Sequence, residues 1–144
     1  MDKIQRLIQD TVRQMSEKSR AKSHVYITDI NLVEHGVLIK FSNGRQQLIN
    51  ILQHAELYLL TSVILKRGRV EKIGREKILP LIWQRNRETN LVAFSIDKQG
   101  RLIGSIEQLT ETADVNELCL YLERLAQECD QLEYLLTGKE KLQN

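Results

Sequence analysis

A long apolar stripe near the C-terminus constrains the fold of this chain more than any other feature of its sequence. Apolar residues recur from Val115 to Leu136 at spacings of three, four, three, four, three and four residues. This period predicts a helix with one apolar side. Asp114 and Glu117 predict the start of that helix as a capping box, and Gly138 suits the position just after its end.

A helix of this length must bury its apolar stripe against a second surface. A coiled-coil partner requires a narrow stripe, whereas a sheet accepts a wider one. Leu120, Ala126 and Leu135 widen the stripe. We therefore favour packing on a sheet over a coiled coil.

The first half of the chain supplies four candidate strands for that sheet, at residues 25–32, 37–42, 45–53 and 57–65. The apolar alternation changes phase between Ile27 and Ile30, which predicts a β-bulge or a bend. Turns are expected at 34–36 and 54–56. Asn43-Gly44 predicts a type I′ hairpin turn, which requires a positive φ at both residues. Because sequential strands with tight connections pair with their neighbours, we expect an antiparallel meander.

The remaining segments alternate between helix and strand. Residues 2–19 have helical apolar spacing, with Asp2 as the cap. Residues 70–88 also have a helical pattern, and the single proline, Pro80, should break or kink this region near 76–80. If two short helices result, Pro80 is expected in the first turn of the second. A loop is expected at 86–90, followed by a hairpin of residues 91–97 and 101–108.

The expected order of elements is therefore α-ββββ-α-ββ-α. It predicts an α+β fold with helices on one face of an antiparallel sheet. A length of 144 residues suits one domain, which we place at residues 1–138. Residues 139–144 are expected to be a frayed tail.

Composition and spacing argue against several classes of protein. No run approaches the roughly 20 apolar residues of a membrane span, and the charged N-terminus has no apolar core of a secretory signal. We therefore expect a cytoplasmic protein without a membrane partner. Cys119 and Cys129 lie ten residues apart on the predicted helix. That spacing is about 15 Å along a helix, too far for a disulfide, so we expect inert buried thiols.

The residue types used in catalysis and cofactor binding do not form a recognisable constellation. His24, His35 and His54 fall in turns or at strand ends without metal-ligand spacing. Gly100 and Gly104 are isolated and form no phosphate-binding loop. We expect no catalytic residue, cofactor or metal site. Gly104 lies within a predicted strand, which indicates a close approach by another element.

Residues 79–138 carry a pattern that resembles a known family. A helix ending in WQRN at 83–86 leads through a short loop to the strand LVAFSI at 91–96. Asp97 and Gly100 follow in a turn, then a second strand and a long helix that ends in DQLEYLL at 130–136. This arrangement resembles the type III secretion chaperone-like proteins, which include the Tir-chaperone-like proteins and the related bacterial sensory transduction regulators. Residues 46–65 are similar to the paired central strands of that family.

The resemblance implies a small, bacterial, cytoplasmic, non-enzymatic homodimer that binds other polypeptides. Secretion chaperones hold an extended effector segment against exposed sheet and helix surfaces. Those chaperones are typically acidic, whereas this chain has a pI of about 8.6. Four predicted strands also precede the second helix. The four strands are closer to the regulator branch of the family than to dedicated effector chaperones.

Charge is separated along the sequence. Residues 66–87, here called the basic segment, hold eight cationic and two acidic residues, a sum of +6. Residues 107–133 hold one cationic and eight acidic residues, a sum of −7. One interpretation is two solvated helix faces of opposite sign that dock near each other. The other is recognition of an acidic partner by the basic segment.

The basic segment and the single tryptophan are our candidate partner-binding residues. They are Lys66, Arg67, Arg69, Lys72, Arg75, Lys77, Trp83, Arg85 and Arg87. For Trp83 we favour core packing between the second helix and the sheet, with a dimer or partner contact as the alternative.

The leading hypothesis is a non-catalytic protein-interaction module, chaperone-like or a regulatory adaptor, that binds a polypeptide partner as a homodimer. The alternative is a nucleic-acid-associated regulator that uses the basic segment. That segment lacks interleaved aromatic residues other than Trp83 and a recognisable nucleic-acid-binding motif.

Overall fold

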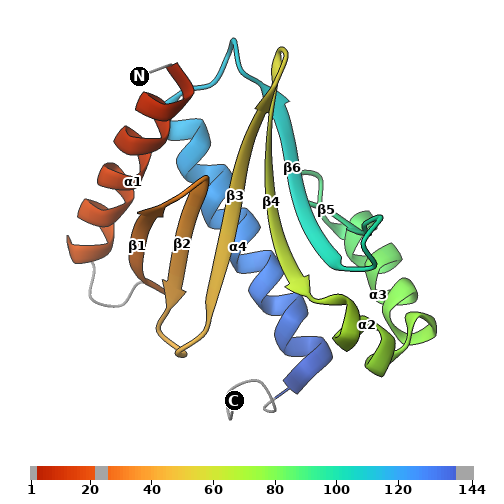
Figure 1. The fold of residues 1–144 in the computed structure, drawn as a ribbon. Coiled ribbons are helices and arrows are strands. Elements are labelled where there is room, and N and C mark those ends of the chain that lie inside the picture. Colours follow the sequence, from red (N-terminus) through yellow and green to blue (C-terminus); the bar gives the residue numbers. More distant parts are fainter. Residues whose placement is uncertain (1–2, 22–25, 139–144) are drawn as a thin grey trace.

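The structure is a computed structural model that describes residues 3–21 and 26–138. Within these residues, six strands form one antiparallel sheet in the order β1-β2-β3-β4-β6-β5. The strands are β1 (Ile27–Val33), β2 (Gly36–Phe41), β3 (Gln46–His54), β4 (Leu57–Leu65), β5 (Ala93–Ile96) and β6 (Leu102–Leu109). The helices are α1 (Lys3–Ala21), α2 (Arg67–Ile73), α3 (Arg75–Glu88) and α4 (Val115–Thr137). The predicted α+β fold is confirmed, with the second helical region divided in two (Figure 1).

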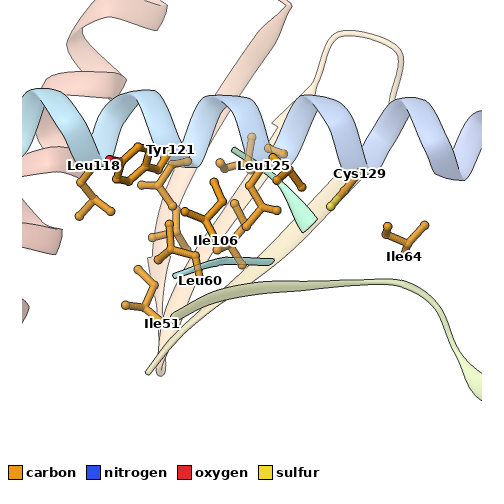
Figure 2. Close-up of a cluster of buried hydrophobic side chains, with 14 of the residues drawn as sticks. Ile51, Leu60, Ile64, Ile106, Leu118, Tyr121, Leu125 and Cys129 are labelled. Atoms are coloured by element: carbon orange, nitrogen blue, oxygen red, sulfur yellow. The ribbon is translucent and has the colours of Figure 1, made fainter. Parts of the chain in front are cut away.

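α4 packs across one face of the sheet, which we call the inner face. Its stripe residues Leu122 and Leu125 are fully buried. Leu60 of β4 is also fully buried and lies on the sheet side of the helix (Figure 2). At Gly104 of β6 the helix comes so close that an added Cβ atom would lie 2.5 Å from the sulfur of Cys129. The predictions of packing on a sheet and of a close approach at Gly104 are both confirmed.

The ends of α4 follow the capping pattern in the sequence. The side chain of Asp114 accepts a hydrogen bond from the Glu117 amide at 2.8 Å, and Gly138 has a positive φ of 58°. α1 packs on β1 and on α4, close to the predicted bounds. The predicted cap at Asp2 and the predicted tail at 139–144 lie outside the described residues.

The connection between β2 and β3 differs from the predicted type I′ turn. Gly44 has a positive φ of 86°, but Asn43 does not. The Asn43 side chain is engaged instead, because its oxygen accepts from the Arg45 amide at 2.9 Å. Such a turn needs only one left-handed residue, which glycine supplies. The predicted bulge in β1 is confirmed by a register shift between Ile27 and Asp29.

The break in the second helical region lies at Gly74, not at 76–80 as predicted. Gly74 has a φ of 100°, which glycine adopts without steric cost. The Gly74 amide donates to the Val70 carbonyl at 2.9 Å, which is the last hydrogen bond of α2. The Gly74 carbonyl accepts from the Lys77 and Ile78 amides at the start of α3. Pro80 therefore lies inside α3 and not in its first turn. Pro80 is exposed, so water can reach the carbonyl that its missing N–H leaves unbonded.

The loop after α3 is shorter than the expected 86–90, because the helix continues to Glu88. β5 is also shorter than the predicted strand at 91–97. The amides of Leu91 and Val92 both donate to the Thr89 hydroxyl at 3.4 Å. This local turn keeps them out of the strand ladder.

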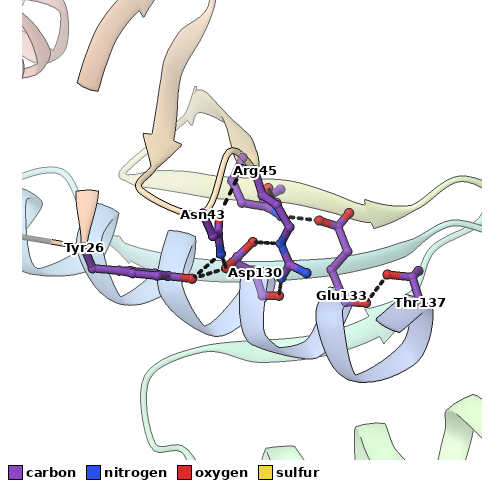
Figure 3. A network of polar contacts seen from close by, with 8 residues as sticks. Tyr26, Asn43, Arg45, Asp130, Glu133 and Thr137 are labelled. Atoms are coloured by element: carbon purple, nitrogen blue, oxygen red, sulfur yellow. Dashed lines mark hydrogen bonds and ion pairs between the residues drawn. The ribbon is translucent and has the colours of Figure 1, made fainter. Parts of the chain in front are cut away.

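A buried polar network joins α4 to the β2–β3 hairpin (Figure 3). Arg45 Nε donates to Asp130 Oδ1 at 2.7 Å, and the two side chains are only 4% and 1% exposed. The Tyr26 hydroxyl also donates to Asp130. Burial, followed by this bond to Asp130, raises the pKa of Tyr26 to about 12. The hydroxyl therefore stays protonated and keeps donating at neutral pH.

A second branch of the network involves β3 and β4. Gln47 donates to Glu133 at 3.2 Å and accepts from the Ser62 hydroxyl at 2.8 Å. Asp130 and Glu133 are each 1% exposed. The interpretation of residues 107–133 as a solvated acidic face is therefore wrong at these two positions, because tertiary packing places them against the sheet.

We expect Gly104→Ala to lower the free energy of unfolding by about 1–3 kcal/mol, because the new methyl group collides with Cys129. Urea denaturation followed by circular dichroism measures this loss. Adding Cys129→Ala should restore part of it, since the colliding sulfur is removed. Ser105→Ala, on the opposite face of β6, is the matched control. Equal denaturation midpoints for Gly104→Ala and Ser105→Ala would contradict the close approach.

We expect Asp130→Asn to cost about 3–5 kcal/mol of stability, because it removes the carboxylate charge that pairs with the buried Arg45 guanidinium. The double variant Arg45→Met/Asp130→Leu removes both charges and should be more stable than the single variant. Chemical denaturation of the three proteins measures the difference. A double variant less stable than Asp130→Asn would show that burial of the pair is not the reason for the loss.

Candidate functional site

A groove of about 430 Å³ lies between α1 and the adjoining ends of β1, β2 and β3. Aliphatic and amide side chains line it, among them Ile4, Ile8, Leu32, Ile51, Gln5, Gln9 and Gln53. The groove follows from the amphipathic pattern of α1, which turns its apolar residues toward β1. Glutamine amides both donate and accept hydrogen bonds. The lining can therefore hold an aliphatic side chain while bonding to the backbone that carries it.

β1 forms one edge of the sheet beside this groove. Val33 and Gly36 pair on either side of a two-residue turn. In an antiparallel ladder, hydrogen-bonded and non-hydrogen-bonded pairs alternate, so the N–H and C=O groups of Ile30 and Leu32 point away from β2. Side chains already bond to Ile30: its amide donates to Asp29 at 3.0 Å, and its carbonyl accepts from Ser16 at 3.4 Å. The Leu32 side chain is 48% exposed at the groove.

β5 forms the other edge of the sheet, and α3 closes it at its centre. The side-chain amide of Asn86 donates to the Phe94 carbonyl at 2.9 Å. The Asn86 oxygen accepts from the Phe94 amide at 2.8 Å. One side chain thus takes the place of a neighbouring strand. This leaves the Leu32 end of β1 as the more accessible place for strand addition.

The basic segment begins where β4 ends and is divided over α2 and α3. The exposed cations are Lys66, Arg67, Lys72, Arg75, Lys77 and Arg87, whereas Arg69 and Arg85 are half-buried. Arg67 pairs with Glu71 at 3.0 Å. Because Gly74 separates the two helices, the cations do not form one continuous helix face.

Trp83 is 64% exposed, so the favoured interpretation of core packing is wrong. α3 turns Ile78 and Ile82 inward instead, which directs Leu79 and Trp83 outward. The Arg87 guanidinium lies 4.7 Å from the centre of the Trp83 ring. A large exposed aromatic next to a cation is typical of residues that anchor protein interfaces.

Proton-transfer and metal chemistry find little support in the described residues. His35 and His54 are exposed in turns, and His24 lies outside the described residues. Burial raises the pKa of the Cys119 and Cys129 thiols, which are free and buried as predicted. Across residues 3–21 and 26–138, no three His, Cys, Asp or Glu side chains are grouped as metal ligands.

No helix in the described part of the chain combines the length and the apolar character that crossing a bilayer requires.

No family model and no curated protein matches this sequence. Solved structures do match the fold. A chain of the heterodimeric ExoU–SpcU complex, from the type III secretion system of Pseudomonas aeruginosa, is 18% identical with a TM-score of 0.51. The match covers 79% of this chain and 85% of that one.

Two further structures match over more of the chain. A chain of the ExsC–ExsE complex is 17% identical with a TM-score of 0.53, over 90% of this chain and 96% of that one. A chain of the HopA1–SchA chaperone–effector complex is 13% identical with a TM-score of 0.51, over 92% and 98%.

This chain has the type III secretion chaperone-like fold. The resemblance inferred from residues 79–138 is thereby confirmed at the level of the fold. The groove beside β1 was missed by sequence reasoning. Its two walls come from residues 4–9 and 32–53, and nothing in the sequence places α1 against β1. The apolar stripe of α1 was the available signal, but it predicts burial and not a groove.

Proposed function

We propose that this chain is a non-catalytic, homodimeric protein of the cytoplasm that binds an extended segment of a partner polypeptide. The observation that carries this proposal is the groove of about 430 Å³ beside the edge of β1. The fold adds support, because a similar structure is described as a chaperone–effector complex. Two free, buried thiols suit a reducing compartment.

Binding is proposed to occur by strand addition at Leu32. The partner's main chain pairs with the outward N–H and C=O of Leu32, which gives affinity with little dependence on sequence. An aliphatic side chain of the partner enters the groove and gives selectivity. Because Asp29 and Ser16 already bond to Ile30, the added strand pairs only at the end of β1 near the groove.

We expect Leu32→Gln to weaken peptide binding at least about tenfold, because it removes apolar contact at the mouth of the groove. The probe is the tightest binder from a fluorescein-labelled library of peptides that alternate aliphatic and polar residues. Fluorescence anisotropy gives the dissociation constants. Leu120→Gln is the matched control, since Leu120 is 50% exposed on α4 and Leu32 is 48% exposed.

Hydrogen exchange provides a second readout of the same binding. The Leu32 amide should gain protection when the peptide binds, because strand addition bonds to it directly. The amide of Ile30 should change little, since Asp29 already bonds to it. Equal losses of affinity in the two leucine variants, or a library without a binder, would contradict this function.

A second candidate surface is the basic segment with Trp83, proposed to contact an acidic part of the partner polypeptide. Exposed cations flank an exposed aromatic there, and clustered positive charge favours binding of anionic partners. Nucleic acid is the alternative ligand for this surface.

We expect Arg75→Glu/Lys77→Glu to weaken binding of a fluorescein-labelled glutamate-rich peptide at low salt, because both cations are exposed on α3. Arg6→Glu/Lys18→Glu is the matched control, since it reverses two exposed cations on α1 and changes the net charge equally. Equal weakening in the two double variants would contradict a local site on α3. Duplex DNA and single-stranded RNA are titrated in parallel. Tight, steeply salt-dependent binding of either nucleic acid would favour the alternative.

A further inference from the structure

The face of the sheet opposite α4, here called the outer face, carries apolar rows on both sides of a polar central row formed by Asn50, Thr61 and Ser105. Its exposed leucines are Leu48, Leu52 and Leu109, at 46%, 55% and 48%. Leu38 pairs with Leu48 across β2 and β3, and Val63 pairs with Ile103 across β4 and β6. These pairs extend an apolar row over four strands. In Figure 1 no described helix lies in front of β2, β3 and β4.

The two ends of the sheet carry charges of opposite sign. Near the β3–β4 turn and the β6–α4 loop, exposed carboxylates lie at Glu56, Glu107, Glu111 and Asp114. At the other end, exposed cations lie at Lys40, Lys66, Arg67 and Lys98. β4 runs from the acidic end to the basic end over nine residues, so the two ends lie roughly 26 Å apart.

Each end also holds charges of the minority sign. At the basic end, Glu71 pairs with Arg67 at 3.0 Å and Asp97 pairs with Arg101 at 2.8 Å. Lys3 bonds to the Thr110 and Glu111 carbonyls from α1, which packs against β1 and α4. Asp29 lies opposite Lys40 in the β1–β2 register. These charges reduce the difference in charge between the two ends without reversing it, because the exposed charges of the majority sign outnumber them at each end.

We propose that a second copy of this chain covers the outer face, turned so that the acidic end of each copy lies over the basic end of the other. This proposal rests on the homodimer of the proposed function and names its surface and orientation. The two-fold axis then runs perpendicular to the strands. The apolar rows of the two faces meet, and the two charged contacts are equivalent by symmetry.

Charge complementarity decides between the two ways of pairing these faces. With the axis along the strands, acidic end would meet acidic end and basic end would meet basic end, and such like-charge contacts oppose association. With the axis across the strands, both contacts are attractive. A face with apolar rows between two ends of opposite charge is complementary to its own copy, which an isologous interface requires.

The surface is tested by Leu48→Lys, which places a charge in an apolar row of the proposed interface. Sedimentation equilibrium should give a dimer for the wild type and a dissociation constant at least about tenfold higher for the variant. Leu120→Lys on α4 is the control, because Leu120 is similarly exposed on another surface and should leave the dimer unchanged. Circular dichroism establishes that both variants are folded.

The orientation is tested by charge reversal at each end. Glu56→Lys/Glu107→Lys should weaken self-association, and so should Lys66→Glu/Lys98→Glu, because each creates two repulsive contacts. Mixing the two variants should restore a dimer that contains one copy of each. The wild-type dimer should also weaken as NaCl is raised from about 0.05 to 0.5 M, since salt screens exposed charges.

The outcomes separate this proposal from the proposed function. A wild-type monomer at micromolar concentration would overturn the homodimer and this interface together, while peptide binding at Leu32 is measured independently. A wild-type dimer that tolerates Leu48→Lys would overturn only the surface. Unchanged self-association of both charge-reversed variants would overturn the orientation.

Discussion

α4 lies so close to β6 that a single methyl group at Gly104 would meet the sulfur of Cys129 at 2.5 Å. Packing at this distance removes the apolar stripe of α4 from water, at about 25 cal/mol for each Å² of apolar surface buried. It also brings the C-terminal half of the helix against β3, where polar residues of both elements meet. The remainder of the sheet is arranged around this contact, since α1 packs on α4 as well as on β1.

The polar network beneath α4 restricts how the helix can sit on the sheet. Apolar stripes tolerate small shifts along the helix axis, whereas a buried carboxylate tolerates no loss of its partners. Asp130 is bonded by Arg45 and Tyr26, which come from two different segments. Sliding α4 by one turn would leave these charges unpaired. The network thereby selects one position of the helix among several that the apolar contacts alone would accept.

The same arrangement gives each remaining surface a distinct character. One edge of the sheet is closed by Asn86, and the other is partly closed by Asp29 and Ser16 at Ile30. Unpaired strand edges promote uncontrolled association. With Phe94 and Ile30 already bonded, the accessible surfaces that remain are the groove beside Leu32 and the outer face. This restriction suits the function proposed above, in which the chain accepts a partner strand without joining its own copies edge to edge.

Much of the fold was predictable from residue patterns with a local physical cause. The capping residues and the apolar period define α4, and alternation defines the strands. Predictions failed where a side chain had a distant partner or a competing neighbour. The Asn43 side chain accepts a hydrogen bond from the Arg45 amide, so the turn differs from the predicted type. Gly74 breaks the helical region before Pro80, because a residue with positive φ ends a helix more sharply than an exposed proline. Trp83 was predicted to be core because its apolar surface is large, yet Ile78 and Ile82 occupy the buried face.

The sequence by itself determined the order of elements, the long C-terminal helix and its packing on a sheet, since these depend on periodicity and turn chemistry. It also indicated the fold family through residues 79–138. Only the tertiary structure decided that Asp130 and Glu133 are buried, that a groove separates α1 from β1, and that the charges divide between the two ends of the sheet. These features join residues far apart in the chain, and no local pattern records which distant residue a side chain will meet.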